Sequence, residues 1–476
     1  MSKVLKNTFI YTIGNILPKI AGFILLPIYL HHLTPKDYGI VNSMNVLQTI
    51  LAVIFSFALE RSVLRLYYDY DLEEDKTKFL GTISVSIFFI STGILVLVLL
   101  TRSLFQKIFA SIDFFPFYLY AILTGYILAF FYIPKAYLML KEKALSFISL
   151  SIVQFLTSSG FILFFIISRG QGAIGMLKGQ LLGAIVIMPW TIFFAIKHFK
   201  LNFNFKMFKN AFAYSWPGIP TLLSAWVLNL SDRVFIARYF TLSDVGIYSL
   251  GYKIAGLGLL LFTAMNMAYK PLFFKLANSA NQISARKQIE KYNSLFIYVV
   301  IAITFALVFF SKEIVYFFFD KRYESSYHIV VLISISYMFV NINSIFGGFL
   351  QQSKKVKQGM IIDIGTAILN IILNLLLIPR FGFYGAAYAT IISFFSAFVI
   401  AYFYSMKYCY FVPVSWKYIW ITIIFLGCIV LVFSFLINVQ LIIGLLIKVG
   451  VVFLIATFFF WKFFNEIKSF LRLRSV

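Results

Sequence analysis

Long apolar runs, separated by short clusters of charged and turn-forming residues, make up nearly the whole chain. A helix needs about 20 mostly apolar residues to cross the ~30 Å hydrocarbon core of a bilayer. Fourteen runs meet this length, so the pattern predicts an all-α polytopic membrane protein with about 14 transmembrane helices. The predicted spans are 7–30, 40–64, 79–101, 117–140, 146–168, 174–196, 211–231, 246–269, 295–319, 328–350, 359–378, 385–406, 418–438 and 442–464.

The composition agrees with this class. Only 12% of the 476 residues are charged, whereas soluble domains carry about 25%. The net charge of +24 would indicate nucleic-acid binding in a soluble protein. In a membrane protein, basic loops that orient the helices explain it better. We therefore exclude nucleic acid as a partner and expect the lipid bilayer to surround the chain.

The Lys and Arg residues divide unevenly between the two sides of the membrane. The loops on one side carry 27 of them and those on the other side carry 9. Because basic loops remain in the cytoplasm, both termini of this multi-pass protein are predicted to be cytoplasmic. The N-terminal run continues to Leu30 without a small-residue cleavage site, so we interpret it as a helix and not as a signal peptide.

The sequence lacks the common signatures of catalysis. The longest loop, 270–294, is too short for an ATPase domain, and neither a phosphate-binding loop nor an HExxH or GxSxG motif occurs. The DxD-like segment 69–71 lies in a charged cytoplasmic run and is interpreted as a solvated loop. Cys409 and Cys428 form no disulfide or metal-binding pattern. We predict a protein that is not an enzyme, with no cofactor and no metal.

Two short segments recur at nearly the same spacing. Residues 34–40 match residues 241–247 at four of seven positions with an offset of 207, and residues 172–175 resemble residues 382–385 with an offset of 210. Both pairs occupy equivalent places in successive groups of six spans. This predicts two six-helix lobes in a parallel repeat, with a shared cavity between them, plus two additional helices at the C-terminus. The predicted units are 1–206, 207–410 and 411–476.

The motifs resemble those of a known family. Residues 33–39, 231–238, 370–382 and 385–390 carry the likeness. On these residues the chain resembles the polysaccharide transporter family of the multidrug/oligosaccharidyl-lipid/polysaccharide flippase superfamily, which includes Wzx-type O-antigen and capsule repeat-unit flippases. The resemblance implies alternating access and translocation of an undecaprenyl-diphosphate-linked oligosaccharide from the inner to the outer leaflet of the bacterial cytoplasmic (inner) membrane. By the same analogy, the last two helices border the lipid tail.

Five cationic side chains are candidates for contacting an anionic substrate. An ionised side chain at the bilayer centre costs about 3 kcal/mol or more and therefore usually faces an interior cavity. Lys19 lies ~18 Å inside the first span and Lys253 ~10 Å inside the eighth, whereas Lys178 lies one turn into the sixth. Arg61 and Arg65 share a face near the cytoplasmic end of the second span, where they serve either as an entrance for a diphosphate or as interface anchors.

Carboxylates are almost absent from the spans. Asp363 and Glu60 are the candidates for ion coupling, although the N-terminus of a helix also stabilises an anion such as Asp363 for purely structural reasons. Asp232 and Arg233 are expected to pair at the outer end of the seventh span, as a gate or as a structural contact. The sequence leaves the energy source open between the membrane potential and a proton or sodium gradient.

Prolines occur in pairs in the first and seventh spans. Pro18 and Pro27, and Pro217 and Pro220, interrupt the backbone hydrogen bonds of the corresponding helix in each lobe. We predict either a gating hinge or a static kink at these positions.

The favoured function is therefore a flippase for a lipid-linked oligosaccharide, with the head group held in a cationic cavity. Two alternatives remain at this point. One is a cation-coupled small-molecule or multidrug antiporter of the same superfamily, for which the cationic spans are unfavourable. The other is an integral-membrane glycosyltransferase or glycan polymerase, for which the outer loops are too short. Other polysaccharide-assembly proteins are candidate partners, and the identity of the glycan stays open.

Overall fold

The computed structural model describes residues 16–279 and 281–408, together with positions 14, 427, 444, 448, 450 and 457. Over these residues the chain is helical, without strands. Together with the apolar length of the helices and the fold likeness reported below, this confirms the predicted all-α polytopic membrane class. The predicted spans 418–438 and 442–464 lie outside the described residues, apart from isolated positions, so the total of fourteen stays a prediction.

The first bundle contains the helices before residue 199. It begins with a helix over Ile16–His32, whose last part is α2 (Leu26–His32). The further helices are α3 (Pro35–Ser56), α4 (Glu60–Leu66), η1 (Tyr67–Asp69), α5 (Glu73–Leu100), α6 (Arg102–Gln106), η2 (Lys107–Phe109), η3 (Phe114–Tyr118), α7 (Leu119–Ala129), α8 (Tyr132–Leu140), α9 (Ala144–Leu163), η4 (Phe164–Ser168) and α10 (Gly172–His198).

The chain continues with α11 (Phe205–Ser215), which packs on the first bundle, and η5 (Trp216–Gly218). The second bundle contains α12 (Ile219–Leu230), α13 (Asp232–Tyr239), α14 (Leu242–Ala277), α15 (Gln282–Phe309), α16 (Ser311–Phe318), η6 (Lys321–Tyr323), α17 (Ser326–Gln352) and α18 (Val356–Tyr408). Residues 356–408 are two helices joined across a kink at Gly382, where φ is +60°, a backbone conformation that glycine adopts readily. The kink separates the predicted spans 359–378 and 385–406.

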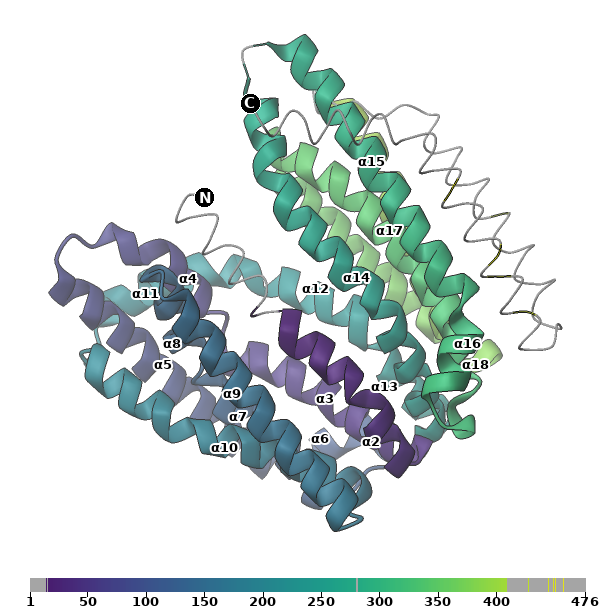
Figure 1. Cartoon of the computed structure of the whole chain (residues 1–476). Coiled ribbons are helices and arrows are strands. Elements are labelled where there is room, and N and C mark those ends of the chain that lie inside the picture. The colour runs from purple at the N-terminus through teal and green to yellow at the C-terminus, as the bar shows by residue number, and fades with distance from the viewer. Residues whose placement is uncertain are drawn as a thin grey trace.

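The two bundles diverge toward one end of the molecule and meet at the other (Figure 1). We call these the open end and the closed end. At the closed end α3 and α14 pack closely against each other, and Leu242, Leu250 and Ile254 of α14 belong to the same apolar core as the helices of the first bundle. The space between the bundles is therefore accessible from the open end.

The chain passes from one bundle to the other at η5. Although α11 follows the first six spans, it packs on α4 and α5 of the first bundle, whereas α12 packs on α18 of the second. The crossing therefore occurs at the Trp-Pro-Gly segment 216–218, and the predicted unit boundary at residue 207 stays a prediction.

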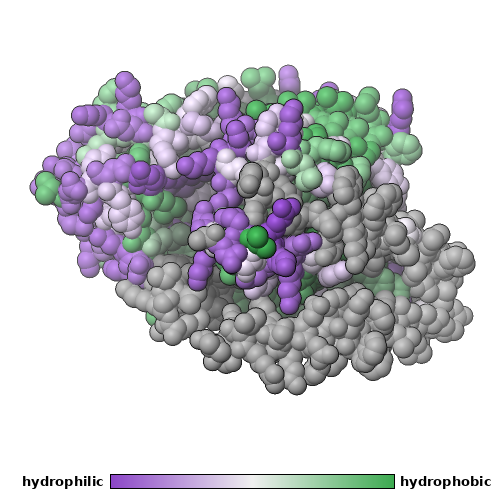
Figure 2. Space-filling view, turned by 90° about the horizontal axis from the view of Figure 1, so that it is seen from above, coloured by the Kyte–Doolittle hydropathy of each residue, from purple (hydrophilic) through white to green (hydrophobic). Residues whose placement is uncertain are grey.

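The molecular surface is apolar along the helices and polar at the open end. Phe89 of α5 and Phe193 of α10 are more than 60% exposed, as expected for side chains in contact with lipid. Viewed onto the open end, hydrophilic residues gather over the first bundle and the centre of the molecule (Figure 2). Beside the start of α5, Lys78 and Lys200 both pair with Glu74 at 3.0 Å. These pairs lower the pKa of Glu74 to about 2.

Candidate functional site

A cavity of about 480 Å³ lies between the two bundles. Its wall combines the first helix and α3 of the first bundle with α13, α14 and α17 of the second. Three of its lining residues are cationic: Lys19 from the first helix, Arg233 from α13 and Lys253 from α14. Asp and Glu are absent from the described lining residues. The cavity is therefore positively charged, with charge contributed by both bundles.

Lys19 and Lys253 face the cavity from opposite bundles. Both side chains are exposed to it, and neither forms an ion pair in the described part of the chain. An ammonium without a partner at this depth is costly in a protein. An anion that entered the cavity would offset that cost, so these two lysines are the strongest candidates for contact with the substrate.

Arg233 is a third cation of the cavity, and it is held rigidly. Its side chain is only 5% exposed and donates a hydrogen bond to the carbonyl oxygen of Asn229. The guanidinium carbon lies 4.1 Å from the ring centre of Tyr252 and 5.1 Å from that of Tyr248, distances at which a cation is attracted to an aromatic face. Arg233 therefore contributes a fixed charge, in contrast to the two lysines.

Asp232 points away from the cavity and does not form the expected pair with Arg233. Its carboxylate accepts hydrogen bonds from Tyr248, from Asn374 at 3.0 Å and from Thr390 at 3.4 Å. Consecutive residues of a helix point in different directions, so the two charged side chains contact different parts of the structure. Asp232 joins α13 and α14 to α18, whereas Arg233 faces the space between the bundles.

Arg61 and Arg65 line a separate hollow of about 400 Å³ nearer the open end. The hollow lies between α4 and the α11–η5 segment, where Arg61 donates a 3.5 Å hydrogen bond to the carbonyl oxygen of Gly218. Arg65 is exposed and pairs with Asp69 one helical turn away, and the hydrogen bond that Arg65 donates to the Asp69 carboxylate raises the pKa of Arg65. The structure thus places these arginines in a hollow of their own and not in the central cavity.

The comparisons with known proteins identify the family. Residues 4–277, more than half of the chain, match the model of the family described as "Polysaccharide biosynthesis protein". The chain belongs to this family. Residues 217–376 also match the MatE family model.

Members and relatives of the family share modest sequence identity with the chain. It is 24% identical over 231 residues to the probable low-salt glycan biosynthesis flippase Agl15 of Haloferax volcanii, covering 48% of this chain and 49% of that protein. It is 22% identical over 421 residues to the capsular polysaccharide biosynthesis protein CapF of Staphylococcus aureus, covering 85% and 99%. The match with Agl15 thus spans about half the length of that relative.

Solved structures show the same fold. The inward closed conformation of the lipid II flippase MurJ superposes with a TM-score of 0.74 at 18% identity, over 96% of this chain and 100% of that one. The inward-facing conformation of a multidrug resistance MATE transporter of the MOP superfamily gives a TM-score of 0.66 at 12% identity, over 84% and 94%. The outward-facing conformation gives 0.58 at 13% identity, over 85% and 94%.

Three other predicted site residues of this chain lie outside its central cavity. The ammonium of Lys178 lies 4.5 Å from the ring centre of Phe165 within the first bundle. Asp363 lines two cavities of about 280 and 270 Å³ in the second bundle. Glu60 begins α4, and one of its carboxylate oxygens is buried without a hydrogen-bond partner among the described residues.

Three of the four predicted prolines lie beside interruptions of the helices, whereas Pro18 lies within the helical stretch that precedes the turn at Leu25. Pro18 lines the central cavity, and Pro27 lies at the start of α2. Pro217 lies in η5 and Pro220 in the first turn of α12, so the predicted span 211–231 is divided into α11, η5 and α12. Pro217 therefore lies at the point where the chain crosses between the bundles, and Pro220 lies just after it. Its role as a hinge stays a prediction.

Some cavity residues were not predicted from the sequence. Ser249, Tyr252 and Gly256 line the cavity beside Lys253, and their spacing of three and four residues places all four on one face of α14. This face is readable in the sequence as a polar and small-residue stripe in an apolar helix. Tyr337 of α17 also lines the cavity, but its apolar neighbours in the sequence give no indication of this position.

Proposed function

We propose that the chain is a flippase that moves an anionic lipid-linked oligosaccharide across the membrane by alternating access. One observation carries this proposal: the cavity between the bundles contains Lys19, Lys253 and Arg233 and no acidic lining residue in the described part of the chain. The name of the Agl15 relative and the family description support a substrate from glycan assembly.

The electrostatics of the cavity favour a diphosphate. A diphosphate concentrates negative charge in a small group, and the attraction between charges is much stronger in a low-dielectric interior than in water. Hydrogen bonds between charged groups are also stronger than neutral ones. The volume of about 480 Å³ is typical of a small-molecule site. We infer that the cavity holds the undecaprenyl-diphosphate head group with its first sugars, while the polyprenyl tail stays in the lipid.

The orientation follows from the basic loops. The side that carries 27 of the Lys and Arg residues in the loops includes the polar face seen in Figure 2. We propose that this open end faces the cytoplasm, with both termini, in the inner membrane. The structure would then be the state that loads substrate from the inner leaflet, with Arg61 and Arg65 attracting the diphosphate at the entrance.

A second candidate function has its own supporting observation. The MatE match over residues 217–376 includes Asp363, Thr221 and Asn343, which line cavities in the second bundle. A carboxylate in a cavity is what a cation-coupled antiporter of small molecules requires. In the flippase proposal, Asp363 and Glu60 serve instead as candidates for coupling transport to an ion gradient.

A vesicle assay separates the two functions. The purified protein is reconstituted into liposomes that contain an undecaprenyl-diphosphate-linked oligosaccharide with a fluorescent label on its sugar, and an impermeant reductant is added outside. The flippase proposal predicts that the protected inner-leaflet label becomes accessible much faster than in protein-free vesicles. An unchanged rate, together with efflux of organic cations driven by a proton or sodium gradient, would establish the antiporter instead.

A further inference from the structure

The repeated segment of the sequence forms the same structure twice at the closed end. Its first copy, 34–40, begins α3, and its second copy, 241–247, begins α14. In both copies the threonine hydroxyl accepts a hydrogen bond from the backbone N–H of the aspartate three residues later, and the aspartate carboxylate accepts one from the threonine N–H. These distances are 3.1 and 3.1 Å in the first copy and 3.2 and 3.0 Å in the second. Each helix therefore starts with a complete capping box.

The glycines of the two copies let the helices cross at backbone contact. A Cβ added to Gly39 would overlap the carbonyl oxygen of Leu242 in the first turn of α14. A Cβ added to Gly246 would overlap the carbonyl oxygen of Pro35 in the first turn of α3. The contact is reciprocal, because the first turn of each helix packs against the glycine of the other helix. Only a residue without a side chain fits either position.

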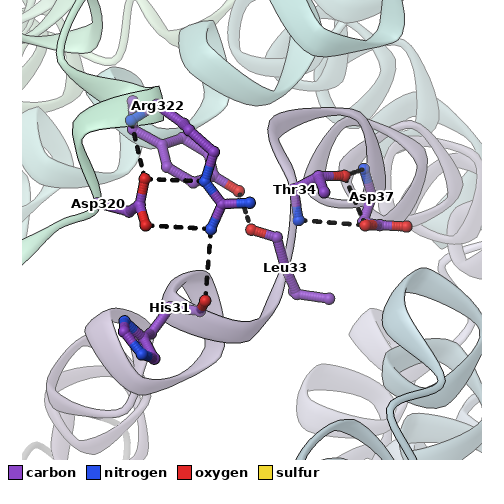
Figure 3. A network of polar contacts seen from close by, with 7 residues as sticks. His31, Leu33, Thr34, Asp37, Asp320 and Arg322 are labelled. Atoms are coloured by element: carbon purple, nitrogen blue, oxygen red, sulfur yellow. Dashed lines mark hydrogen bonds and ion pairs between the residues drawn. The ribbon is translucent and has the colours of Figure 1, made fainter.

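The same end is also joined by two hydrogen bonds to backbone carbonyls (Figure 3). Arg322 donates to the carbonyl oxygen of His31 at 3.4 Å, and the hydroxyl of Tyr323 donates to that of Leu33 at 3.2 Å. Asp320 holds the Arg322 guanidinium at 2.8 and 3.1 Å, and these hydrogen bonds lower the pKa of Asp320. We call the contacts of Arg322 and Tyr323 the latch. The latch connects η6 of the second bundle to the end of the first helix.

We propose that the duplicated T-x-x-D-x-G segment is the closing device of this end. The two capping boxes keep the first turns of α3 and α14 rigid, and the two glycines allow these turns to cross at backbone contact, which closes this end of the cavity together with the shared apolar core. When this end opens, the latch, the backbone contact and the apolar packing of α14 and η6 against the first bundle must part, while each helix keeps its own capped first turn. The device works in the same way whichever substrate the cavity carries.

Alanine at either glycine tests the device without any substrate. In a background with Cys409→Ser and Cys428→Ser, the single cysteine of Leu257→Cys reports on the cavity, which Leu257 lines. We expect Gly39→Ala and Gly246→Ala each to raise its labelling, by an impermeant maleimide added outside the cells, several-fold. The double variant should label no faster than the faster single variant, because both glycines serve one contact.

Gly93→Ala is the matched control, because nothing lies within 4 Å of a Cβ added to this helical glycine of α5. Labelling of the folded Gly39→Ala and Gly246→Ala variants at the control rate would overturn the proposal. The vesicle assay for flipping is not involved, so failure here leaves the proposed function untouched, and the reverse also holds.

A second measurement keeps both glycines and so does not depend on the folding of the alanine variants. Spin labels at Lys36→Cys and Ser243→Cys, one on each crossing helix, report the separation of the two first turns. We expect Arg322→Ala combined with Tyr323→Phe, which removes the latch, to add a longer distance to the distribution. A distance distribution identical to that of the intact latch would show that the crossing does not move with this end and would contradict the proposal.

Discussion

Replacing Lys19 with alanine is expected to lower the rate of flipping at least about tenfold, and Lys19→Glu to abolish it. A hydrogen bond to a charged group contributes about 1.5–3 kcal/mol, and each 1.4 kcal/mol corresponds to about a factor of ten in affinity. Lys19 has no ion-pair partner in the described residues, so the substrate anion is its natural counter-charge. Glutamate would add repulsion within a cavity of low dielectric. The vesicle assay with labelled lipid-linked oligosaccharide measures both variants.

Lys178→Ala is the matched control for this prediction. Lys178 is also a lysine within a predicted span, but it stacks on Phe165 and lies outside the cavity. We expect this variant to flip substrate at close to the unmodified rate. Full activity of Lys19→Ala and Lys19→Glu, with normal amounts of folded protein, would contradict a direct role for the cavity charge.

Locking the closed end is expected to stop flipping completely and reversibly. A chain with His31→Cys and Arg322→Cys carries one thiol on each side of the latch, and a short bifunctional thiol reagent with a disulfide in its linker joins them. The two bundles must separate at the closed end before substrate can leave on that side of the membrane, so cross-linked protein should not flip substrate. Cleaving the linker with a reductant should restore the rate of the untreated variant.

Two controls accompany the cross-link. Each single-cysteine variant receives the same reagent, which accounts for simple modification of either site. Glu73→Cys with Lys76→Cys, three residues apart at the start of α5, places a cross-link within one helix of the first bundle and should leave flipping unchanged. Persistent flipping by protein that is fully cross-linked at the latch would show that this end does not open during transport.

The sequence predicted the helices well because their main determinant is local. A run of about 20 apolar residues is sufficient to specify a membrane helix, and the described residues of each of the first twelve predicted spans are mainly helical. The breaks were harder to predict. The predicted span 40–64 is interrupted where Phe57 and Ala58 adopt positive φ, and neither residue type signals such a turn. The predicted span 295–319 is likewise divided between two helices, because α15 ends at Phe309 and α16 begins at Ser311.

The site shows the same division between local and tertiary information. The depth of Lys19 and Lys253 within their spans is a local property, and the structure brings both to one cavity, although their role in binding stays a prediction. Arg233 was expected to serve as a gate or structural residue next to Asp232. Its position on the cavity depends on how α13 packs against α14, and on the rings of Tyr248 and Tyr252. No local sequence pattern could therefore predict that Arg233 lines the cavity.

The central claim is that the cationic cavity binds a lipid-linked diphosphate. Native mass spectrometry of the protein, purified in mild detergent from its own membranes, tests this most directly, alongside the Lys19→Ala, Lys253→Ala double variant. The account predicts a bound undecaprenyl-diphosphate oligosaccharide on the unmodified protein and its loss from the double variant. Unmodified protein that carries no such lipid, and does not bind it when it is added, would contradict the claim.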